Sequence, residues 1–360
     1  MKKIFVLLSA IWLGSSLFAQ VDDDGATERP QKVVYNLIFN IAPDPFNIPL
    51  VGFVNLANGD FQSLQLGFVN TTFHDFHGAQ ISFVNSTFND HYGLQMGFVN
   101  TTFAKSHHVQ TGFINTAGSA QGAQIGFVNT SYKTLTGLQL GFINLARGKQ
   151  LGAVKAEETL DGVQTGFVNA TIGNAKGSQL GFVNLTSGKM KGSQLGFVNF
   201  ADTVSGVPFG FLSIVRKGGY RAITLSVNEF YPVNLSFKIG VPKLYTFIQV
   251  GYNPNLDKRL ATGGGFGTLL PISKSLYFNP EISSLTPLNY DHGMQISSLA
   301  CNLSYQITPF LQISAGPSVT HAYFGKAETQ FKPAYHFIDH KINDKNRLIL
   351  SARAAIGITF

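Results

Sequence analysis

A unit of the form Gly-x-Gln-x-Gly-Phe-Val-Asn recurs through the first half of the chain, mostly at intervals of 14 or 15 residues. Such self-similarity is typical of repeat architectures, in which each unit stacks on the next. A gap of 25 residues between Gly141 and Gly166 is predicted to hold one shortened, degenerate copy at 152–155. The residues to which we assign a structural role in the best-preserved copies are Gly67, Phe68, Asn70, Gly97, Phe98, Asn100, Gly126, Phe127, Asn129, Gly141, Phe142, Asn144, Gly181, Phe182, Asn184, Gly196, Phe197 and Asn199.

Apolar residues alternate with other residues within each unit, as Leu138, Leu140 and Phe142 do with Gln139 and Gly141. A period of two predicts a strand, and the asparagine that follows is suited to a turn. So short a coil cannot bury its apolar side chains alone, whereas stacked copies can. The repeats therefore predict a parallel β-solenoid over residues 35–216 with about twelve coils. We expect the phenylalanine and leucine side chains inside it, and the asparagine and glutamine side chains in stacked rows.

A second interpretation makes each unit one strand of an antiparallel membrane barrel. Such barrels have short turns on one side and longer loops on the other, so the spacing should alternate. The nearly uniform spacing favours the solenoid. One large barrel that includes both halves of the chain and acts as a pore or transporter remains the alternative.

The repeat unit resembles that of a known family. Residues 137–144, Gly-Leu-Gln-Leu-Gly-Phe-Ile-Asn, and 122–129, Gly-Ala-Gln-Ile-Gly-Phe-Val-Asn, are similar to the Gly-x-Gln-Ile-Gly-Leu-Val-Asn units of bacterial surface-repeat proteins. The similarity covers residues 50–215. Phenylalanine mostly replaces the expected aliphatic residue, which implies a wider core. The resemblance implies an envelope location and little about activity.

The repeat stops near residue 217, and 217–360 is predicted to be a second domain. Residues 233–241 alternate between apolar and polar side chains, and similar runs elsewhere predict about eight antiparallel strands. The last run ends at Phe360 and resembles the terminal signal of outer-membrane barrels, of which eight strands is the smallest size. A soluble β-sandwich or barrel that caps the solenoid is the alternative.

The beginning of the chain predicts export. Residues 1–19 have a basic start, a short apolar run and small residues before Ala19, which together are typical of a secretory signal peptide. Residues 20–34 are acidic and are predicted to be a flexible leader. Cys301 is the only cysteine, so no intramolecular disulfide can form, and we expect a buried structural thiol.

The sequence contains few candidate catalytic or metal-binding residues. His77, His91 and His107 could approach one another across stacked coils and bind a transition metal, although surface turn positions are the simpler interpretation. We predict no cofactor, and we find no nucleophile or metalloprotease motif, so an enzyme is not expected. The net charge of +7 comes from scattered lysines and arginines, which argues against nucleic-acid binding.

These features together predict a non-enzymatic outer-envelope protein of a Gram-negative bacterium, located in the outer membrane or at the cell surface. The repeat rod would act as a structural or interaction surface for an unidentified ligand or protein, with the terminal region as its base in the membrane.

Overall fold

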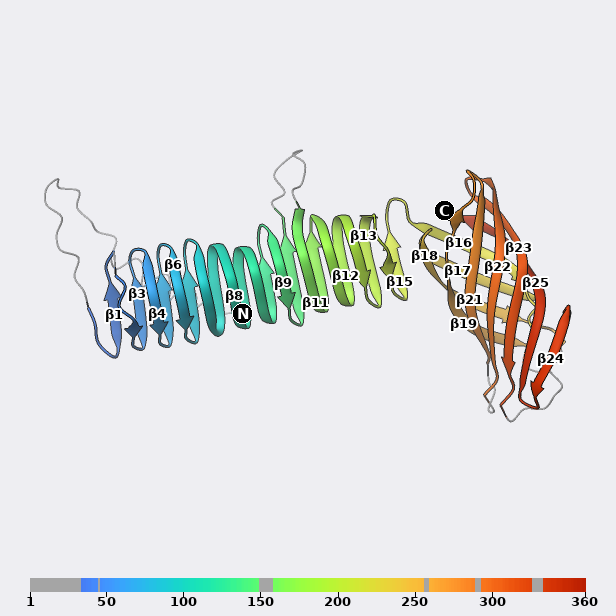
Figure 1. Ribbon diagram of the computed structural model, residues 1–360, viewed down its shortest axis with the longest axis horizontal. Coiled ribbons are helices and arrows are strands. Elements are labelled where there is room, and N and C mark those ends of the chain that lie inside the picture. Colours follow the sequence, from blue (N-terminus) through green and yellow to red (C-terminus); the bar gives the residue numbers. More distant parts are fainter. Residues whose placement is uncertain (1–33, 45, 149–157, 256–258, 289–292, 326–332) are drawn as a thin grey trace.

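The computed structural model describes residues 34–44, 46–148, 158–255, 259–288, 293–325 and 333–360. All regular secondary structure in these ranges is β-strand, arranged as one parallel and one antiparallel sheet system. Figure 1 shows a rod of stacked coils whose last turns lie beside a barrel. The predicted all-β class and the predicted order of solenoid and barrel are confirmed.

The rod is a solenoid of flat coils, each made of two strands and two corners. In one coil, β4 (Phe61–Leu66) leads through a corner at residues 67–68 to β5 (Val69–Thr72). The strands pair in parallel with the equivalent strands one repeat away, so that Asn70 aligns with Asn85. About 11 turns stack in this way between residues 39 and 215.

Several strands of the solenoid are continuous around corners, so their lengths differ widely. Their bounds are β1 (Phe39–Ala42), β2 (Leu50–Val51), β3 (Val54–Ala57), β4 (Phe61–Leu66), β5 (Val69–Thr72), β6 (Phe76–Ile81), β7 (Val84–Thr87), β8 (His91–Ser131), β9 (Leu135–Leu140), β10 (Ile143–Arg147), β11 (Glu158–Ile172), β12 (Asn174–Leu195), β13 (Val198–Val204), β14 (Pro208–Phe209) and β15 (Leu212–Val215).

The solenoid has the opposite polarity to the one we expected. Four positions of each coil point inward, represented by Phe61, Gln65, Asn70 and Thr72, and two of them carry buried amides. The repeat phenylalanines, such as Phe68, lie outside at the corner. The expectation that they fill the core is therefore wrong, because alternation defines two faces without saying which one is enclosed.

The coils on either side of the 25-residue gap pair directly. β10 aligns with β11 so that Asn144 lies opposite Asn169, and the amide of Asn144 donates to that of Asn169 at 2.9 Å. The predicted shortened copy at 152–155 lies outside the described residues, and β10 pairs directly with β11. The pairing explains why there are about 11 turns where twelve were expected.

The second half is a closed antiparallel barrel whose eight wall strands match the predicted runs. β16 pairs with β17 and also with β25, which closes the wall. β20 and β24 are short additions beside β21 and β25. The bounds are β16 (Tyr220–Val227), β17 (Val233–Val241), β18 (Leu244–Tyr252), β19 (Leu260–Gly267), β20 (Leu270–Pro271), β21 (Leu276–Pro287), β22 (Gln295–Thr308), β23 (Leu311–Tyr323), β24 (Ile338–Asn343) and β25 (Asn346–Thr359).

The single large barrel is excluded by this topology. The repeat strands pair in parallel with one another, whereas the barrel strands pair antiparallel and close on themselves. The last solenoid strand, β15, ends at Val215 and the first barrel strand begins at Tyr220.

The two ends of the barrel differ in the length of their connections. At one end, residues 242–243 join β17 to β18, 309–310 join β22 to β23, and 268–275 join β19 to β21. At the other end, the connections are 228–232, 253–259, 288–294 and 324–345. Figure 1 places the carboxyl terminus at the end nearest the solenoid, which is the end with the shorter turns.

Candidate functional site

The most unusual surface of the molecule is a column of phenylalanine rings along one edge of the solenoid, which we call the aromatic edge. Neighbouring rings stack with centroids 4.9–5.0 Å apart and planes within 1–8° of parallel. Each ring is between 44% and 57% exposed. The aromatic edge consists of Phe53, Phe68, Phe83, Phe98, Phe113, Phe127, Phe142, Phe167, Phe182, Phe197 and Phe211.

The glycine before each of these phenylalanines, replaced by Ser82 only before Phe83, lets the coils approach closely. A Cβ at Gly97 would lie 2.1 Å from the carbonyl oxygen of Ser82 in the preceding coil. The corner therefore favours a residue without a side chain, although Ser82 occupies it in one coil, and the ring that follows is directed outward. The Gly-Phe pair of the repeat places one exposed ring per coil.

The repeat asparagines and glutamines form two buried ladders inside the solenoid. Asn100 donates from Nδ2 to Oδ1 of Asn115 at 2.8 Å and to the Thr111 carbonyl at 2.9 Å. Gln110 donates from Nε2 to Oε1 of Gln95 at 2.6 Å. Stacked amides satisfy one another, so their burial is not penalised. The predicted amide rows are confirmed, and their role is structural.

The three histidines predicted as a metal site do not converge. His77 and His107 lie on one outer column, but the ring of Tyr92 is stacked between them, with centroids 4.4 and 4.3 Å away. His91 points into the solenoid and stacks on Phe76. Within the described residues, no three His, Cys, Asp or Glu side chains are grouped to hold a metal ion.

His91 is the only one of these three that is fully buried. Its Nδ1 lies 3.3 Å from the Thr87 hydroxyl. Burial lowers the pKa of His91 to about 3, helped by the nearby His108, His77 and His107. The ring is therefore neutral at ordinary pH and serves as core packing.

His108 occupies a strained backbone position. Its φ is 91°, whereas the equivalent residues in neighbouring coils include Gly93 and Gly122, both with φ of 134°. A side chain at positive φ is disfavoured unless the surrounding structure enforces it.

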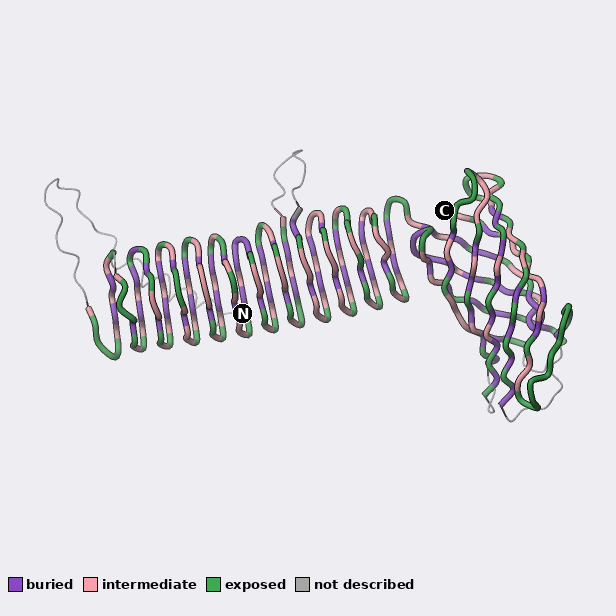
Figure 2. The backbone as a smooth tube through the Cα atoms, viewed as in Figure 1, coloured by how far each residue is buried: buried purple, intermediate pink, exposed green. Residues whose placement is uncertain are grey.

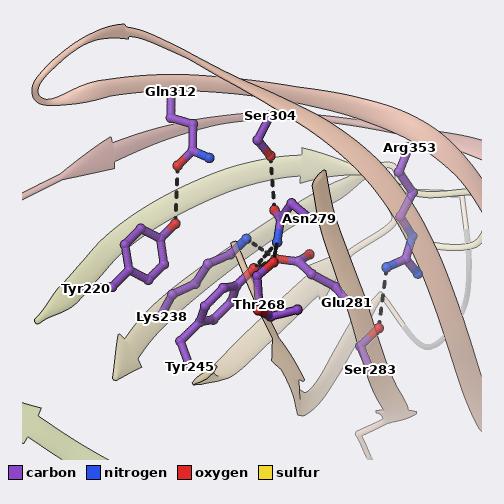
Figure 3. Close-up of polar contacts among 10 residues, drawn as sticks. All are labelled: Tyr220, Lys238, Tyr245, Thr268, Asn279, Glu281, Ser283, Ser304, Gln312 and Arg353. Carbon is purple, nitrogen blue, oxygen red and sulfur yellow. Dashed lines mark hydrogen bonds and ion pairs between the residues drawn. The ribbon is translucent and has the colours of Figure 1, made fainter. Parts of the chain in front are cut away.

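The barrel interior holds a polar network that the sequence interpretation missed (Figure 3). The Lys238 ammonium contacts the Glu281 carboxylate, and the Tyr245 hydroxyl donates to Glu281 at 2.5 Å. Asn279 donates to the Tyr245 oxygen and accepts from the Ser304 hydroxyl at 3.1 Å. Lys238 lies on the polar face of β17, so the alternation contained a signal, but it did not identify this face as the inner one.

Further polar side chains line part of the interior, next to a cluster of buried apolar residues that includes Phe230, Leu285 and Met294. The Tyr220 hydroxyl donates to Gln312, and Arg353 donates to the Ser283 hydroxyl (Figure 3). A cavity of about 20 Å³ remains beside Arg353 and Glu281. That space suits a single water molecule rather than a channel.

The outer wall of the barrel is apolar. Side chains that point away from the interior along the wall strands are mostly aliphatic, and many are more than 40% exposed. Cys301 lies midway along β22 on this outer face and is partly exposed, so its expected burial in the core is wrong. The exposed apolar residues of the wall include Ile223, Leu225, Val233, Leu235, Ile248, Val250, Leu260, Phe266, Ile282, Leu299, Leu303, Ile313, Val319, Ile356 and Ile358.

An apolar groove lies where the aromatic edge meets the barrel wall. It has a volume of about 860 Å³ and is lined on the solenoid side by Phe182, Phe197 and Phe211. Ile248 and Gly264 are among its lining residues on the barrel side. The junction itself is held by a hydrogen bond of 2.9 Å from the Thr246 hydroxyl to the Phe211 carbonyl.

Phe360 lies at this same end of the barrel. Its ring is exposed and its N–H donates to the Arg221 carbonyl at 3.2 Å. The Arg221 guanidinium in turn donates to the Val215 carbonyl in the last coil at 3.0 Å. Phe360 therefore belongs to the region that joins barrel to solenoid.

Comparison with known proteins finds no matching family model, no matching curated protein and no matching solved structure. The stacked strands and amide ladders establish a tandem-repeat protein without assigning it to a family. No helix in the described part of the chain is long and apolar enough to cross a membrane.

Proposed function

We propose that the protein is a non-enzymatic component of the outer membrane, in which the barrel is embedded and the solenoid projects from it as a rigid arm. The observation that carries this proposal is the polarity of the barrel. Lys238, Glu281 and Arg353 face inward while Leu235, Leu299 and Ile356 face outward. A soluble barrel encloses apolar side chains, whereas a membrane barrel presents them to lipid.

The alternation of buried and exposed residues around the barrel supports the same proposal (Figure 2). Exposed positions alternate with buried ones along β17, β22 and β25, and the buried ones carry mostly polar or small side chains. A soluble monomer rarely exposes an apolar surface that encircles a whole domain. Contact with hydrocarbon removes that penalty, while Lys238, Glu281, Tyr245 and Asn279 hydrogen-bond with one another inside.

Aromatic side chains lie toward both rims of the outer wall. Tyr252 and Tyr323 end β18 and β23 at the rim with long connections. Tyr305 and Phe310 lie near the short turn between β22 and β23. Rings of aromatic side chains at both membrane interfaces are typical of membrane barrels. Under the proposal these tyrosine and phenylalanine side chains take that role, since the chain has no tryptophan after Trp12.

The connection lengths support an orientation. Outer-membrane barrels have short periplasmic turns and longer extracellular loops. Because the solenoid adjoins the end with short turns, the arm would extend into the periplasm rather than from the cell surface. The resemblance of the units to a surface-repeat family agrees with an envelope location and does not distinguish the two sides.

The filled interior supports a structural role for the barrel over conduction. Eight-stranded barrels are just wide enough for side chains to fill them. Here Lys238, Glu281, Tyr245 and Phe247 occupy the centre, and Lys238 lies 5.6 Å from the Phe247 ring centroid.

Fractionation and gel mobility test the membrane base. The mature protein should require detergent for extraction and should migrate faster unheated than boiled, since folded membrane barrels resist dodecyl sulfate. Release as a soluble species by buffer alone would contradict the proposal. Planar bilayers that contain the protein should show no conductance steps, and steady channel openings would contradict the structural role.

Cysteine labelling tests the orientation. In a Cys301→Ser background, Asn255→Cys places a thiol in a long connection and Lys133→Cys places one on the solenoid; both parent residues are exposed. A charged maleimide added to intact cells should label the first variant and should label the second only after the outer membrane is permeabilised. The reverse pattern would place the arm on the cell surface.

A further inference from the structure

The aromatic edge continues into aliphatic columns on both sides. Leu66, Ile81 and Leu195 precede the ring in their coils, and Val69 and Val183 follow it. Within the described residues of these three columns there is no charged side chain. Charged residues such as Asp75 and Lys133 lie at other positions of the coil. The solenoid is therefore amphipathic along its whole length.

Backbone N–H and carbonyl groups at this edge already form hydrogen bonds between neighbouring coils. The N–H of Phe68 donates to the Phe53 carbonyl at 2.9 Å, and the N–H of Val84 donates to the Phe68 carbonyl at 3.0 Å. An occupant would find aromatic faces and aliphatic side chains with few hydrogen-bonding partners. Recognition of a sugar or a peptide needs placed polar groups, whereas a hydrocarbon chain needs none.

The position of the groove identifies the source of such a chain. Phe209 in the last coil stacks on Phe266 of the barrel wall, with ring centroids 5.5 Å apart. Phe182, Phe197 and Phe211 therefore face a wall that, under the proposed function, contacts the hydrocarbon of the membrane. The apolar edge and the apolar wall form one continuous surface, joined by a groove of about 860 Å³.

We propose that the aromatic edge and its groove at the barrel bind the acyl chains of membrane phospholipids. This inference rests on the proposed function for the source of the lipid. Acyl chains in the leaflet on the solenoid side reach the groove directly, and the stacked rings extend the same apolar surface along the arm. The groove volume lies within the range of sites that enclose small apolar ligands.

The test uses the full mature chain in phospholipid vesicles that contain a phosphatidylethanolamine with a diazirine at the end of one acyl chain. The test variant is Phe182→Ser/Phe197→Ser. The control is Phe88→Ser/Phe103→Ser, which removes two exposed and mutually stacked rings from a different column of the solenoid. Both variants lose similar stacking, so a general effect on the coil would appear in both.

After irradiation, lipid adducts are mapped by peptide mass spectrometry. The wild type should show adducts in coil residues 181–197 as well as on the barrel wall. The test variant should lose the coil adducts about tenfold, and the control should stay within about twofold of wild type. Adducts on β21 to β25, which lie away from the groove lining, provide an internal measure of insertion.

The outcomes separate the two proposals. Barrel adducts without coil adducts, or equal coil adducts in both variants, would overturn lipid binding and leave the membrane base intact. Coil adducts without barrel adducts would support lipid binding and contradict the membrane base. A dimer that is lost in the test variant, together with absent coil adducts, would mean that a second copy covers the edge and would overturn the inference.

Discussion

Phe209 in the last turn of the solenoid stacks on Phe266 of β19 in the barrel wall, with the two ring planes 12° apart. The pair joins the outer surface of the solenoid to the outer surface of the barrel, and both surfaces are apolar there. Inside the barrel and the solenoid lie buried polar side chains together with apolar clusters, and outside lie aromatic and aliphatic side chains. Under the proposed function, membrane hydrocarbon covers the apolar outer wall of the barrel.

The amide ladder should dominate the stability of the solenoid. Asn100→Leu removes the amide that donates to Asn115 Oδ1 and to the Thr111 carbonyl and that accepts from Asn85, and each unsatisfied buried group costs about 1–3 kcal/mol. We expect a clear decrease in the midpoint of thermal unfolding followed by circular dichroism. The exposed Asn89→Ala should change it little. Equal midpoints for the two variants would contradict a supporting role for the ladder.

His91 should make the solenoid sensitive to acid. Its pKa is about 3 when folded and near 6.5 when unfolded, so protonation favours unfolding. The contribution of neutral His91 is complete above pH 6.5 and decreases by about 1.4 kcal/mol per pH unit from there down to pH 3. His91→Phe removes this dependence and should gain about 2 kcal/mol relative to wild type on going from pH 7 to pH 5.

The exposed His74→Phe serves as the control for that experiment, because its ring is already accessible to water. Urea unfolding at the two pH values gives the comparison. A His91→Phe variant with the same pH dependence as wild type would contradict the low pKa.

Replacing the strained His108 should stabilise the coil. Position 108 has positive φ, and the neighbouring coils carry glycine there. His108→Gly should raise stability by about 0.5–1 kcal/mol, since the relief of backbone strain exceeds the added chain entropy. Gly122→Ala should act in the opposite direction, because its Cβ would lie 2.1 Å from the His108 carbonyl oxygen. A shift of the thermal unfolding midpoint in the same direction for both variants would refute this explanation.

The Lys238 and Glu281 pair should behave as a buried ion pair. Lys238→Met leaves the carboxylate with Tyr245 alone, and Glu281→Gln removes the partner of the ammonium group. Each single change should cost about 3–5 kcal/mol, whereas Lys238→Met/Glu281→Leu should cost less because no charge remains unpaired. The temperature at which the unheated gel band converts to the boiled band provides the measurement. A double variant weaker than either single variant would contradict the pairing.

Labelling of the natural cysteine should test whether the outer wall of the barrel faces lipid, as proposed. Cys301 lies between the outward-facing Leu299 and Leu303. In vesicles, a charged maleimide should not label it, an apolar maleimide should, and boiling in dodecyl sulfate should expose it to both. Asn255→Cys in the Cys301→Ser background should react with the charged reagent throughout. Rapid labelling of native Cys301 by that reagent would place the wall in water.

The sequence predicted the positions of the strands better than it predicted which face of each strand points inward. The two-residue period located the strands of each coil and all eight barrel strands, because successive side chains of a strand point to opposite faces. It could not assign Phe68 to the outside and Gln65 to the inside, since burial of an amide depends on an identical amide one coil away. The inward face of β17, with Lys238, was equally unassignable, because that choice depends on whether water or lipid surrounds the barrel.

The candidate site was hidden for a related reason. Phe182 and Phe266 are distant in sequence, and only the closure of the barrel and the stacking of the last coils bring them to the same groove. The histidine hypothesis failed on side-chain direction: His91 is one residue before Tyr92, and that single step separates the inner face from the outer one.

The direct pairing of Asn144 with Asn169 has a consequence for the reach of the arm. The chain has additional residues between β10 and β11, and the amide and aromatic columns nevertheless continue in register from one coil to the next. Whole units could then be duplicated or deleted without disturbing their neighbours, while the barrel stays the same. Under the proposed function, the distance between the membrane and the tip of the arm is thus adjustable in steps of one coil, without any change to the barrel.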